Sequence, residues 1–446
     1  MKNKLKHPNK RVKQTTTKQY FALIACTALP LIFLLNQCRT APEKTEITLS
    51  NKSEITLTDK AISIERSQIT SFKTDNHYPL IISAQGDTIA SQLNDLDGDN
   101  KCDELFLVVD LPANEAESYT LQWIDETPGY VVRTSARFGK RSSADTPVEP
   151  AVSETLHAKD LPKSIGFQRY QTDGPSWEND KIGFRHYLDG RNAKDLFGKT
   201  ASFMSPENVG INAQGAVEDN YHVMADWGRD ILAVGNSVGI GGYGLMVDDK
   251  LLRLGVTVDD SINNVVKTIF RITAEGPVKS VLSYHYENWN PDESRSYQVD
   301  EKTSIWPGMY AYQNTVKFSG LQGDEDLIIG LVNSNNQNPL QEISVNDQWQ
   351  VLLTHDMQTY DRQWWLGLAL IVPRDLYLGY MEAPKIGKLS NSFLAKLKIE
   401  NNKPVSYYAA AGWEMSDERF KDPEFFRSYI ENLVRQLSAK VEVTIK

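Results

Sequence analysis

Short runs rich in Ile, Val, Thr and Tyr recur along almost the whole chain, with turn residues between them. Clear examples are EITLS (46–50), ELFLVVDL (104–111), SYTLQWI (118–124), KTIFRITA (267–274) and LGLALIVP (366–373). Runs of this length and composition are typical of antiparallel strands in sandwich folds. They predict a mostly β protein with few helices.

A polar segment that contains three prolines, residues 140–162, interrupts this pattern. We therefore predict an N-terminal β-sandwich domain over 46–150 and a second β domain over 151–446. The second part is too long for a simple sandwich of about 100 residues, which favours a larger sandwich of many-stranded sheets. The clearest helical signal is residues 416–437, where Ser416 is a candidate cap and apolar residues follow at helical spacing.

The chain begins with a basic segment, residues 1–18, and an uncharged apolar one, residues 21–35. This order predicts a secretion signal over 1–38, because a spanning helix needs about 20 apolar residues. An uncleaved anchor helix is the alternative. Cys38 ends the apolar run where a lipoprotein carries its acyl chains, so we predict lipidation there and a tether over 39–45. The protein is then expected in the periplasm or at the cell surface.

The formal net charge is −10, and residues 1–38 contain seven basic residues and no acid, which leaves the rest near −17. A protein with this much net negative charge does not bind nucleic acid through a general basic surface. An anionic ligand would need a local cluster of basic side chains. Only Cys102 remains besides Cys38, so no disulfide framework is expected. Nothing in the sequence indicates an oligomeric state.

Carboxylates alternate along the segment 95–104, DLDGDNKCDE. Alternate oxygens on a tight loop suit Ca²⁺, which takes six to eight oxygen ligands. The spacing resembles the short calcium loops of integrin-type propeller repeats and dockerins, except that Asn100 stands where those loops have Gly. Asn tolerates positive φ, so the loop remains possible. The predicted ligands are Asp95, Asp97, Asp99, the Lys101 carbonyl and Asp103. We expect a structural role for the ion; a solvated acidic turn is the alternative. No organic cofactor is expected.

Polar and aromatic residues gather between 177 and 289, which is what a carbohydrate site needs. Arg185 and Tyr187 share one face of the predicted strand 182–189, whereas His186 lies on the other face and is expected to be buried. Ordinary sandwich core is the alternative for each aromatic residue. The chain has no phosphate loop, dinucleotide fingerprint or nucleophile elbow. The candidate substrate-binding residues are Trp177, Glu178, Arg191, Tyr221, Asp226, Trp227, Tyr286 and Trp413.

Four segments resemble a secreted family encoded in bacterial gene clusters for acidic polysaccharides, notably the algal polysaccharide ulvan. They are residues 89–112 (IASQLNDLDGDNKCDELFLVVDLP), 174–199 (GPSWENDKIGFRHYLDGRNAKDLFGK), 221–232 (YHVMADWGRDIL) and 274–289 (AEGPVKSVLSYHYENW). The resemblance implies a dehydratase that acts on short ulvan fragments. The segment GPVKSV resembles sequences of the large β-sandwich of the galactose-mutarotase type. The resemblance assigns no catalytic residue.

Removal of water from a uronate is a β-elimination: a base takes the C5 proton and the 4-hydroxyl leaves with a proton from an acid. The sugar carboxylate must be neutralised, for which Arg185 is the first candidate and Arg191 the second. We expect His222 to be the base and Tyr187 the acid. An exo-acting polysaccharide lyase, a glycoside hydrolase that uses Glu178 and Asp226, and a non-catalytic glycan-binding lipoprotein are the alternatives.

Overall fold

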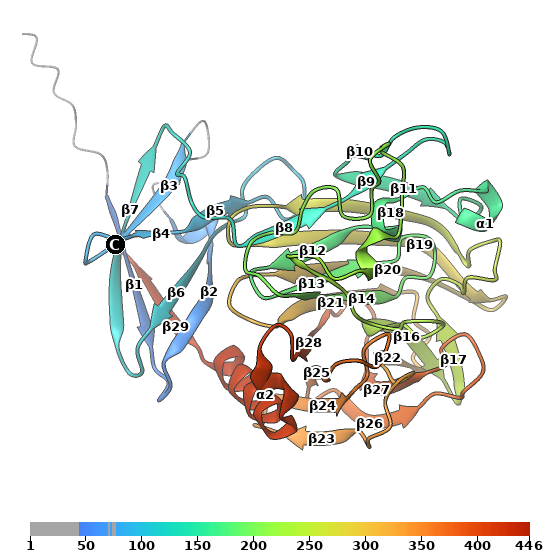
Figure 1. The fold of residues 1–446 in the computed structure, drawn as a ribbon. Coiled ribbons are helices and arrows are strands. Elements are labelled where there is room, and N and C mark those ends of the chain that lie inside the picture. The colour runs from blue at the N-terminus through green and yellow to red at the C-terminus, as the bar shows by residue number, and fades with distance from the viewer. Residues whose placement is uncertain (1–43, 70–71, 74–76) are drawn as a thin grey trace, which may run out of the picture. The chain divides into compact units, whose positions relative to one another are not determined.

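The computed structural model describes residues 44–69, 72–73 and 77–446. The predicted signal (1–38), the predicted lipidation at Cys38 and most of the predicted tether lie outside these residues. Antiparallel sheets dominate the described chain, where α-helix is limited to α1 (Pro162–Ile165) and α2 (Pro423–Ser438) (Figure 1). The prediction of a mostly β protein with one C-terminal helix is confirmed. No described helix is both long and apolar enough to cross a bilayer.

Two small sheets, ordered β29-β1-β7-β3-β4 and β2-β6-β5, form a sandwich around one apolar cluster. The strands are β1 (Thr45–Asn51), β2 (Leu57–Glu65), β3 (Tyr78–Ser83), β4 (Thr88–Ile89), β5 (Ser91–Asn94), β6 (Glu104–Leu111), β7 (Ala116–Ile124) and β29 (Val441–Ile445). The alternation of β1 turns Ile47 and Leu49 into this core, whereas Glu46 stays exposed.

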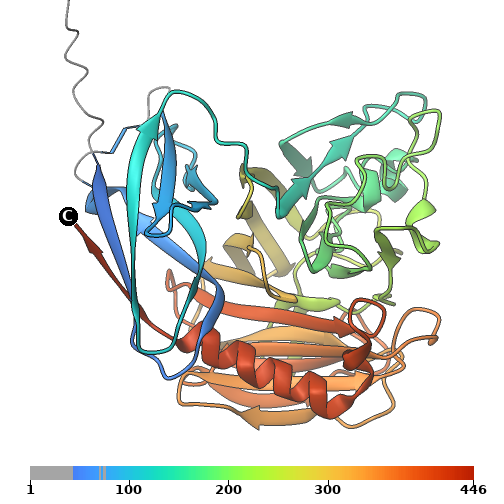
Figure 2. The same cartoon turned by 60° about the vertical axis from the view of Figure 1, so that its left-hand side comes forward.

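The last strand of the chain belongs to this first sheet. β29 pairs antiparallel with β1, with Ile445 opposite Ile47, and Figures 1 and 2 show the two strands side by side. In the other direction, β8 (Thr134–Arg137) pairs with β12 (Ser176–Asn179) in the larger part of the fold. Two pairings thus cross the predicted boundary at residue 150, and the domain limits 46–150 and 151–446 stay a prediction.

A nine-stranded sheet, ordered β11-β18-β19-β20-β21-β28-β25-β24-β23, is the largest in the described chain. Its strands are β11 (Ser153–His157), β18 (Val265–Ala274), β19 (Ser280–Asp292), β20 (Arg295–Ile305), β21 (Ala311–Ser319), β23 (Gln341–Ser344), β24 (Trp349–Asp356), β25 (Leu366–Pro373) and β28 (Val405–Trp413).

Two five-stranded sheets pack on one face of the nine-stranded sheet, and all three share one apolar cluster. The first, β15-β14-β13-β12-β8, adds β13 (Ile182–His186), β14 (Lys194–Lys199) and β15 (Gly228–Asp230). The second, β17-β16-β22-β27-β26, consists of β16 (Ile240–Val247), β17 (Lys250–Arg253), β22 (Glu325–Val332), β26 (Tyr377–Glu382) and β27 (Ser392–Lys398). A two-stranded ribbon, β9 (Gly139–Lys140) and β10 (Glu149–Pro150), completes the fold.

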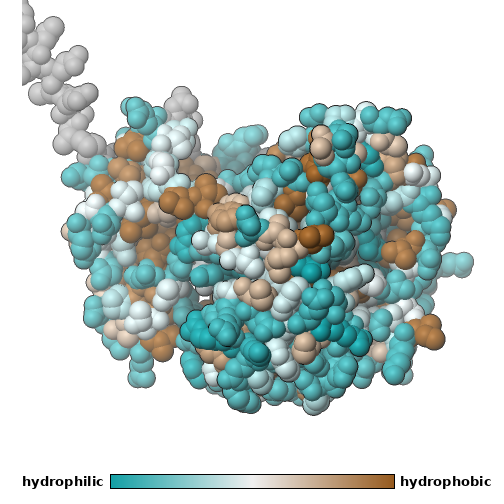
Figure 3. Space-filling view, viewed as in Figure 1, coloured by the Kyte–Doolittle hydropathy of each residue, from teal (hydrophilic) through white to brown (hydrophobic). Residues whose placement is uncertain are grey.

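Helix α2 covers the opposite face of the nine-stranded sheet at β24 and β25 (Figure 2). The helix begins later than predicted: Asp422 caps it by accepting a hydrogen bond from the Glu424 N–H, and Pro423 occupies the first turn. Ser416 instead donates to the carbonyl of Lys199. Hydrophilic side chains cover most of the face seen in Figure 3, and hydrophobic ones occur there in small separate groups.

A polar network lies inside the main apolar core. The ammonium of Lys194 on β14 donates to Glu301 Oε1 on β20 at 2.5 Å, and both side chains have no exposed surface. Tyr243 and Tyr286 each donate to Glu301 Oε2 at 3.0 Å. His186 lies 3.3 Å from Lys194 Nζ, and burial together with this ammonium lowers the pKa of His186 to about 3. His186 is thus a buried, neutral histidine, as predicted.

We expect Lys194→Met to destabilise the protein by about 3–5 kcal/mol, because it leaves the Glu301 carboxylate buried without its cation. The double variant Lys194→Met, Glu301→Gln should regain part of this loss. Urea unfolding at neutral pH measures both. Lys250→Met breaks the exposed pair of Lys250 with Asp292 and should leave stability close to that of the wild type. Equal losses in the two single variants would contradict the assignment.

Candidate active site

The five-stranded sheet β15-β14-β13-β12-β8 has a polar outer face. Register places Arg185 of β13 opposite Asp195 of β14, and Phe197 of β14 opposite Asp230 of β15. Next to this face lies a cavity of about 300 Å³. Its ionisable lining consists of Asp173, Arg185, Tyr187, Asp219, Tyr221, His222, Asp230 and Tyr360.

The guanidinium of Arg185 holds the floor of this cavity together. Its Nη2 donates to Asp195 Oδ2 at 2.6 Å, to Asp230 Oδ2 at 2.7 Å and to the Tyr187 hydroxyl at 2.6 Å. Among the described residues, Nη1 has only a long contact, 3.5 Å, with the Thr172 carbonyl, so it is the donor with capacity for a ligand. Burial acts to lower the pKa of Arg185, but Tyr187 and the two carboxylates raise it well above its ordinary value. The charge is permanent.

Tyr187 lies between two arginines, with its ring centroid 4.5 Å from the Arg185 guanidinium carbon and 3.6 Å from that of Arg191. Its hydroxyl donates to Asp195 Oδ2 at 2.5 Å. Burial raises the pKa of Tyr187 well above its ordinary value, so the phenol keeps its proton. Arg191 pairs with Asp189 at 2.7 Å and with Asp173 at 3.4 Å, and it therefore supports the wall rather than lining the cavity.

Two carboxyl groups of the cavity hold protons more tightly than usual. Burial and the charge of Asp195 raise the pKa of Asp230 to about 8. Burial and Asp189 raise the pKa of Asp173 to about 6. Two carboxylates cannot both be ionised cheaply beside one buried guanidinium, so a proton remains on Asp230 at neutral pH. The site therefore contains a carboxylic acid.

His222 supplies an imidazole that solvent can reach. Its side chain is 41% exposed, and Nδ1 lies 3.6 Å from Asp230 Oδ2. Its ring packs between Tyr221 and Tyr360, with centroid distances of 4.8 and 5.9 Å. Partial burial and the charge of Arg185 lower the pKa of His222, so the ring is neutral at pH 7 and can accept a proton.

Comparison with known proteins places this sequence in a family. The model of the family "Domain of unknown function (DUF4861)" matches residues 49–443. The chain belongs to this family. The "Uncharacterized protein P7" of Formosa agariphila is 23% identical over 300 residues, which cover 62% of this DUF4861 chain and 68% of the relative.

Two solved structures are similar in part. An alpha-mannosidase from Enterococcus faecalis V583 gives a TM-score of 0.47 at 11% identity and matches 90% of this chain. A glycosyl hydrolase family 38 protein from Enterococcus faecalis gives a TM-score of 0.45, also at 11% identity and over 90% of this chain. The DUF4861 chain covers 46% and 47% of these structures, about half of their length.

The structure brings four sequence-predicted residues of the DUF4861 chain into one cavity: Arg185, Tyr187, Tyr221 and His222. Sequence reasoning missed Asp173, Asp195, Asp219 and Asp230. Asp195 and Asp230 lie within the quoted segments that carry the family resemblance, and this was the signal that could have drawn attention to them. Tyr221 donates to Asp219 at 2.9 Å, which fixes the phenol at the cavity edge.

Three predicted substrate contacts are core residues instead. Trp177 stacks on Phe184 and is 1% exposed, because β12 turns it to the inner face of its sheet. Tyr286 belongs to the Glu301 network in the interior. Trp413 lies against Gly198 of β14, where a Cβ would overlap its ring. None of the three lines the cavity.

The remaining candidates do not line the cavity. Glu178 is buried, pairs with Lys199 and accepts a hydrogen bond from the Ser205 N–H. Asp226 is exposed, and Trp227 packs against Phe197 at a centroid distance of 5.8 Å. Neither Glu178 nor Asp226 lines the cavity, so it is not built around this predicted hydrolase pair.

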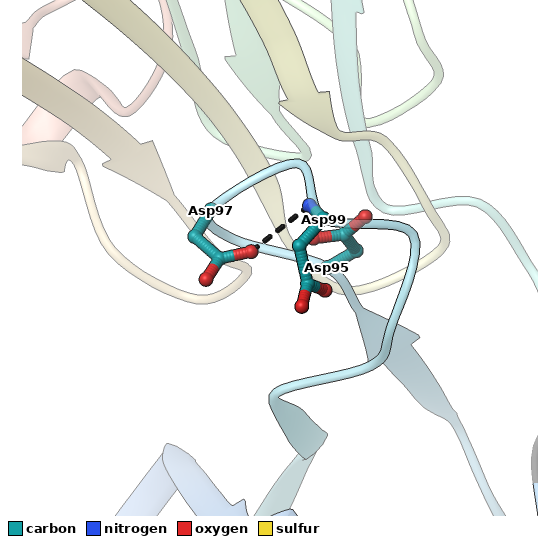
Figure 4. A group of neighbouring side chains, drawn as sticks. All are labelled: Asp95, Asp97 and Asp99. Carbon is teal, nitrogen blue, oxygen red and sulfur yellow. Dashed lines mark hydrogen bonds between the residues drawn. The ribbon is translucent and has the colours of Figure 1, made fainter.

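The acidic loop lies between β5 and β6. Carboxylate oxygens of Asp95, Asp97 and Asp99 lie within 4.8 Å of one another, and Figure 4 shows Asp97 accepting a hydrogen bond from the Asp99 N–H. Asn100 has a φ of 65°, the left-handed conformation expected where related loops have Gly. Asp103 instead accepts a hydrogen bond from the Leu96 N–H at 2.6 Å and is not part of the three-residue group. The Lys101 ammonium pairs with Asp99 at 2.8 Å.

Asp230→Asn should flatten the dependence of stability on pH. The folded-state pKa of Asp230, about 8, is above its unfolded value of 3.8, so the folded state binds this proton more tightly. That stabilisation is complete below the unfolded pKa. As the pH rises from there it decreases by up to ~1.4 kcal/mol per pH unit, and it is lost once the pH has passed about 8.

Urea unfolding of wild type and Asp230→Asn between about pH 5 and 8 measures this difference in slope. Asp226→Asn, which changes an exposed aspartate four residues earlier, is the matched control and should keep the wild-type slope. A wild-type slope in Asp230→Asn would mean that Asp230 does not hold the proton.

Proposed function

We propose that this protein is a carbon–oxygen lyase, a dehydratase that removes water from a uronate of an oligosaccharide by β-elimination. One observation carries the proposal: a permanent guanidinium, a protonated carboxyl, a phenol and a neutral imidazole line the same cavity. These are the groups that the elimination requires. The choice of ulvan as the source of the oligosaccharide rests on the family resemblance of the quoted segments.

The reaction assigns one task to each group. Arg185 Nη1 binds the sugar carboxylate and stabilises the negative charge that develops when the C5 proton leaves. His222 takes that proton, because its imidazole is neutral and accessible. The C4–O bond then breaks as the C4–C5 double bond forms, and the leaving hydroxyl receives a proton and departs as water.

Two groups are candidates for the acid. Tyr187 was predicted for this role, and its phenol keeps its proton, but that proton is donated to Asp195. Asp230 holds a second proton with a raised pKa and lies 3.6 Å from His222. We assign the acid to this Tyr187–Asp230 pair, whose members share the Arg185 Nη2.

Charge places a condition on an anionic substrate. Asp173, Asp219 and Asp230 line the cavity with Arg185, and three ionised carboxylates would repel a uronate. The raised pKa values of Asp173 and Asp230 reduce this repulsion at neutral to mildly acidic pH. Productive binding is therefore expected when at least Asp230 is protonated.

Two other activities use overlapping groups. An exo-acting polysaccharide lyase needs the same residues and releases a sugar in place of water. A glycoside hydrolase is the second candidate, favoured by the two high-pKa carboxyls Asp173 and Asp230 in one cavity. A glycan-binding lipoprotein without activity is the remaining alternative. We further propose export through residues 1–38, with a lipid anchor at Cys38.

We also propose that the acidic loop binds Ca²⁺ and stabilises the N-terminal sandwich. The three clustered carboxylates Asp95, Asp97 and Asp99 and the left-handed Asn100 support this proposal. Asp103 and the Lys101 carbonyl would complete the ligand set after a local rearrangement. The ion would neutralise side chains that otherwise repel one another.

Incubation of the protein with oligosaccharides that end in a saturated uronate with a free 4-hydroxyl should yield a product lighter by one water and with an unchanged number of sugars. His222→Gln should lower kcat by about 10²–10⁴-fold, because the base is lost while the cavity keeps its shape. Mass spectrometry of the products measures both effects.

His285→Gln is the matched control, since His285 is similarly exposed but lies outside the cavity. It should keep wild-type activity. Two shorter products would indicate a lyase or a hydrolase, and full activity of His222→Gln would refute the assigned base.

Addition of Ca²⁺ to the metal-free protein should raise its Tm, and a chelator should reverse this. Asp97→Asn should weaken the effect by removing one charged ligand. Asp87→Asn, which changes an acid outside the loop, should retain it. Thermal unfolding that does not respond to Ca²⁺ would exclude the site.

A further inference from the structure

The nine-stranded sheet has a second surface of interest, on the face opposite the core. Along β18, β19, β20 and β21, alternate residues are buried in the core, and those between them are at least partly exposed. A groove of about 690 Å³ crosses these strands, and Leu96 and Asp97 of the acidic loop line it as well. Four strands about 4.8 Å apart give this groove a width on the order of 14 Å, enough for a short oligosaccharide.

The Glu301 carboxylate at the base of the groove is bound by Lys194 in the core, so the cations Arg271, Lys302 and Lys317 face only two other acids, Asp97 and Asp300. Lys317 and His285 both contact Asp300, at 2.9 and 2.6 Å. Arg271 and Lys302 form no ion pair with any described residue. The Lys302 ammonium has only a long contact, 3.4 Å, with the Leu96 carbonyl. Burial and the neighbouring Lys279 lower the pKa of Lys302, and the more distant charges of Asp103, Glu104 and Asp97 offset this only in part.

Hydroxyl groups lie beside these cations. Thr273, Ser283 and Thr315 line the same groove and are partly exposed. Hydroxyl side chains suit the many donors and acceptors of a sugar, whereas unpaired cations suit an acidic substituent. The rest of the chain is acidic, so this surface is a local exception of the kind that an anionic ligand requires.

We propose that this groove is a second binding site, which holds an anionic oligosaccharide by its carboxylate or sulfate groups on Arg271 and Lys302. The negative charge of the occupant follows from the side chains of the groove. Its sugar nature rests on the proposed function. The site serves to retain a polysaccharide chain and not to carry out the reaction.

The groove and the catalytic cavity lie on opposite sides of the main core. The sheet that carries Arg185 on its outer face presents Lys194 on its inner face, where Lys194 meets Glu301 of the nine-stranded sheet. The groove is on the other face of the nine-stranded sheet, away from this core. A short oligosaccharide therefore cannot fill both sites, and groove variants should leave turnover of short substrates unchanged.

The test is calorimetric titration of wild type and the double variant Arg271→Ala, Lys302→Ala. Each is titrated with a carboxylated, a sulfated and a neutral oligosaccharide of equal length. Loss of two charge-assisted contacts should weaken the anionic ligands by at least about 10-fold. The binding should also weaken with added salt. The affinity ratio of the two anionic ligands identifies the preferred substituent.

Lys267→Ala is the matched control, because Lys267 lies on the same face of β18, pairs with Glu287 and does not line the groove. It should bind like wild type. The single variant Lys302→Gln removes one charge with a smaller change of the side chain, so it still tests the groove if the double variant does not fold. Unchanged affinity in both groove variants, or equally tight binding of the neutral ligand, would overturn the proposal. Charge-dependent binding without any dehydration would uphold the groove and refute the proposed function alone.

Discussion

The buried ion pair between Lys194 and Glu301 connects the two layers on which the candidate site depends. Both groups are fully buried, and their charges are tolerated only because Tyr243, Tyr286 and His186 surround them with hydrogen-bonding partners. Such a pair adds little net stability over an apolar pair, but loss of one partner is costly. Its effect is to fix how β14 lies on β20.

The position of β14 decides what its other face presents. Residues alternate along β14, so Lys194 points into the core and Asp195 points to the cavity. Asp195 then pairs with Arg185, and Arg185 brings in Asp230 from β15. A shift of one residue would exchange the two faces and bury the wrong charges. The core network and the cavity are therefore two consequences of one register.

The sequence predicted the fold class and some of the residues that the structure brings together in the candidate site, and the limits have physical reasons. Arg185 and Tyr187 were grouped correctly because they are two residues apart on one extended segment, and Tyr221 and His222 are adjacent. The carboxylates Asp195 and Asp230 were missed because only strand register brings them to Arg185.

Other differences between the predicted and the observed positions have the same cause: the sequence does not show which distant residues come together. Trp177, Tyr286 and Trp413 were assigned to the substrate because an aromatic residue fits a sugar site and a sandwich core equally well in sequence. The pairing of β29 with β1 joins residues about 400 positions apart, which no local pattern indicates.

Dehydration is tested most directly with a uronate oligosaccharide whose reducing end has been chemically reduced. This substrate is incubated with the protein in heavy-oxygen water. A dehydratase gives a product lighter by one water that contains no heavy oxygen; incorporation of heavy oxygen into a shortened product would contradict dehydration.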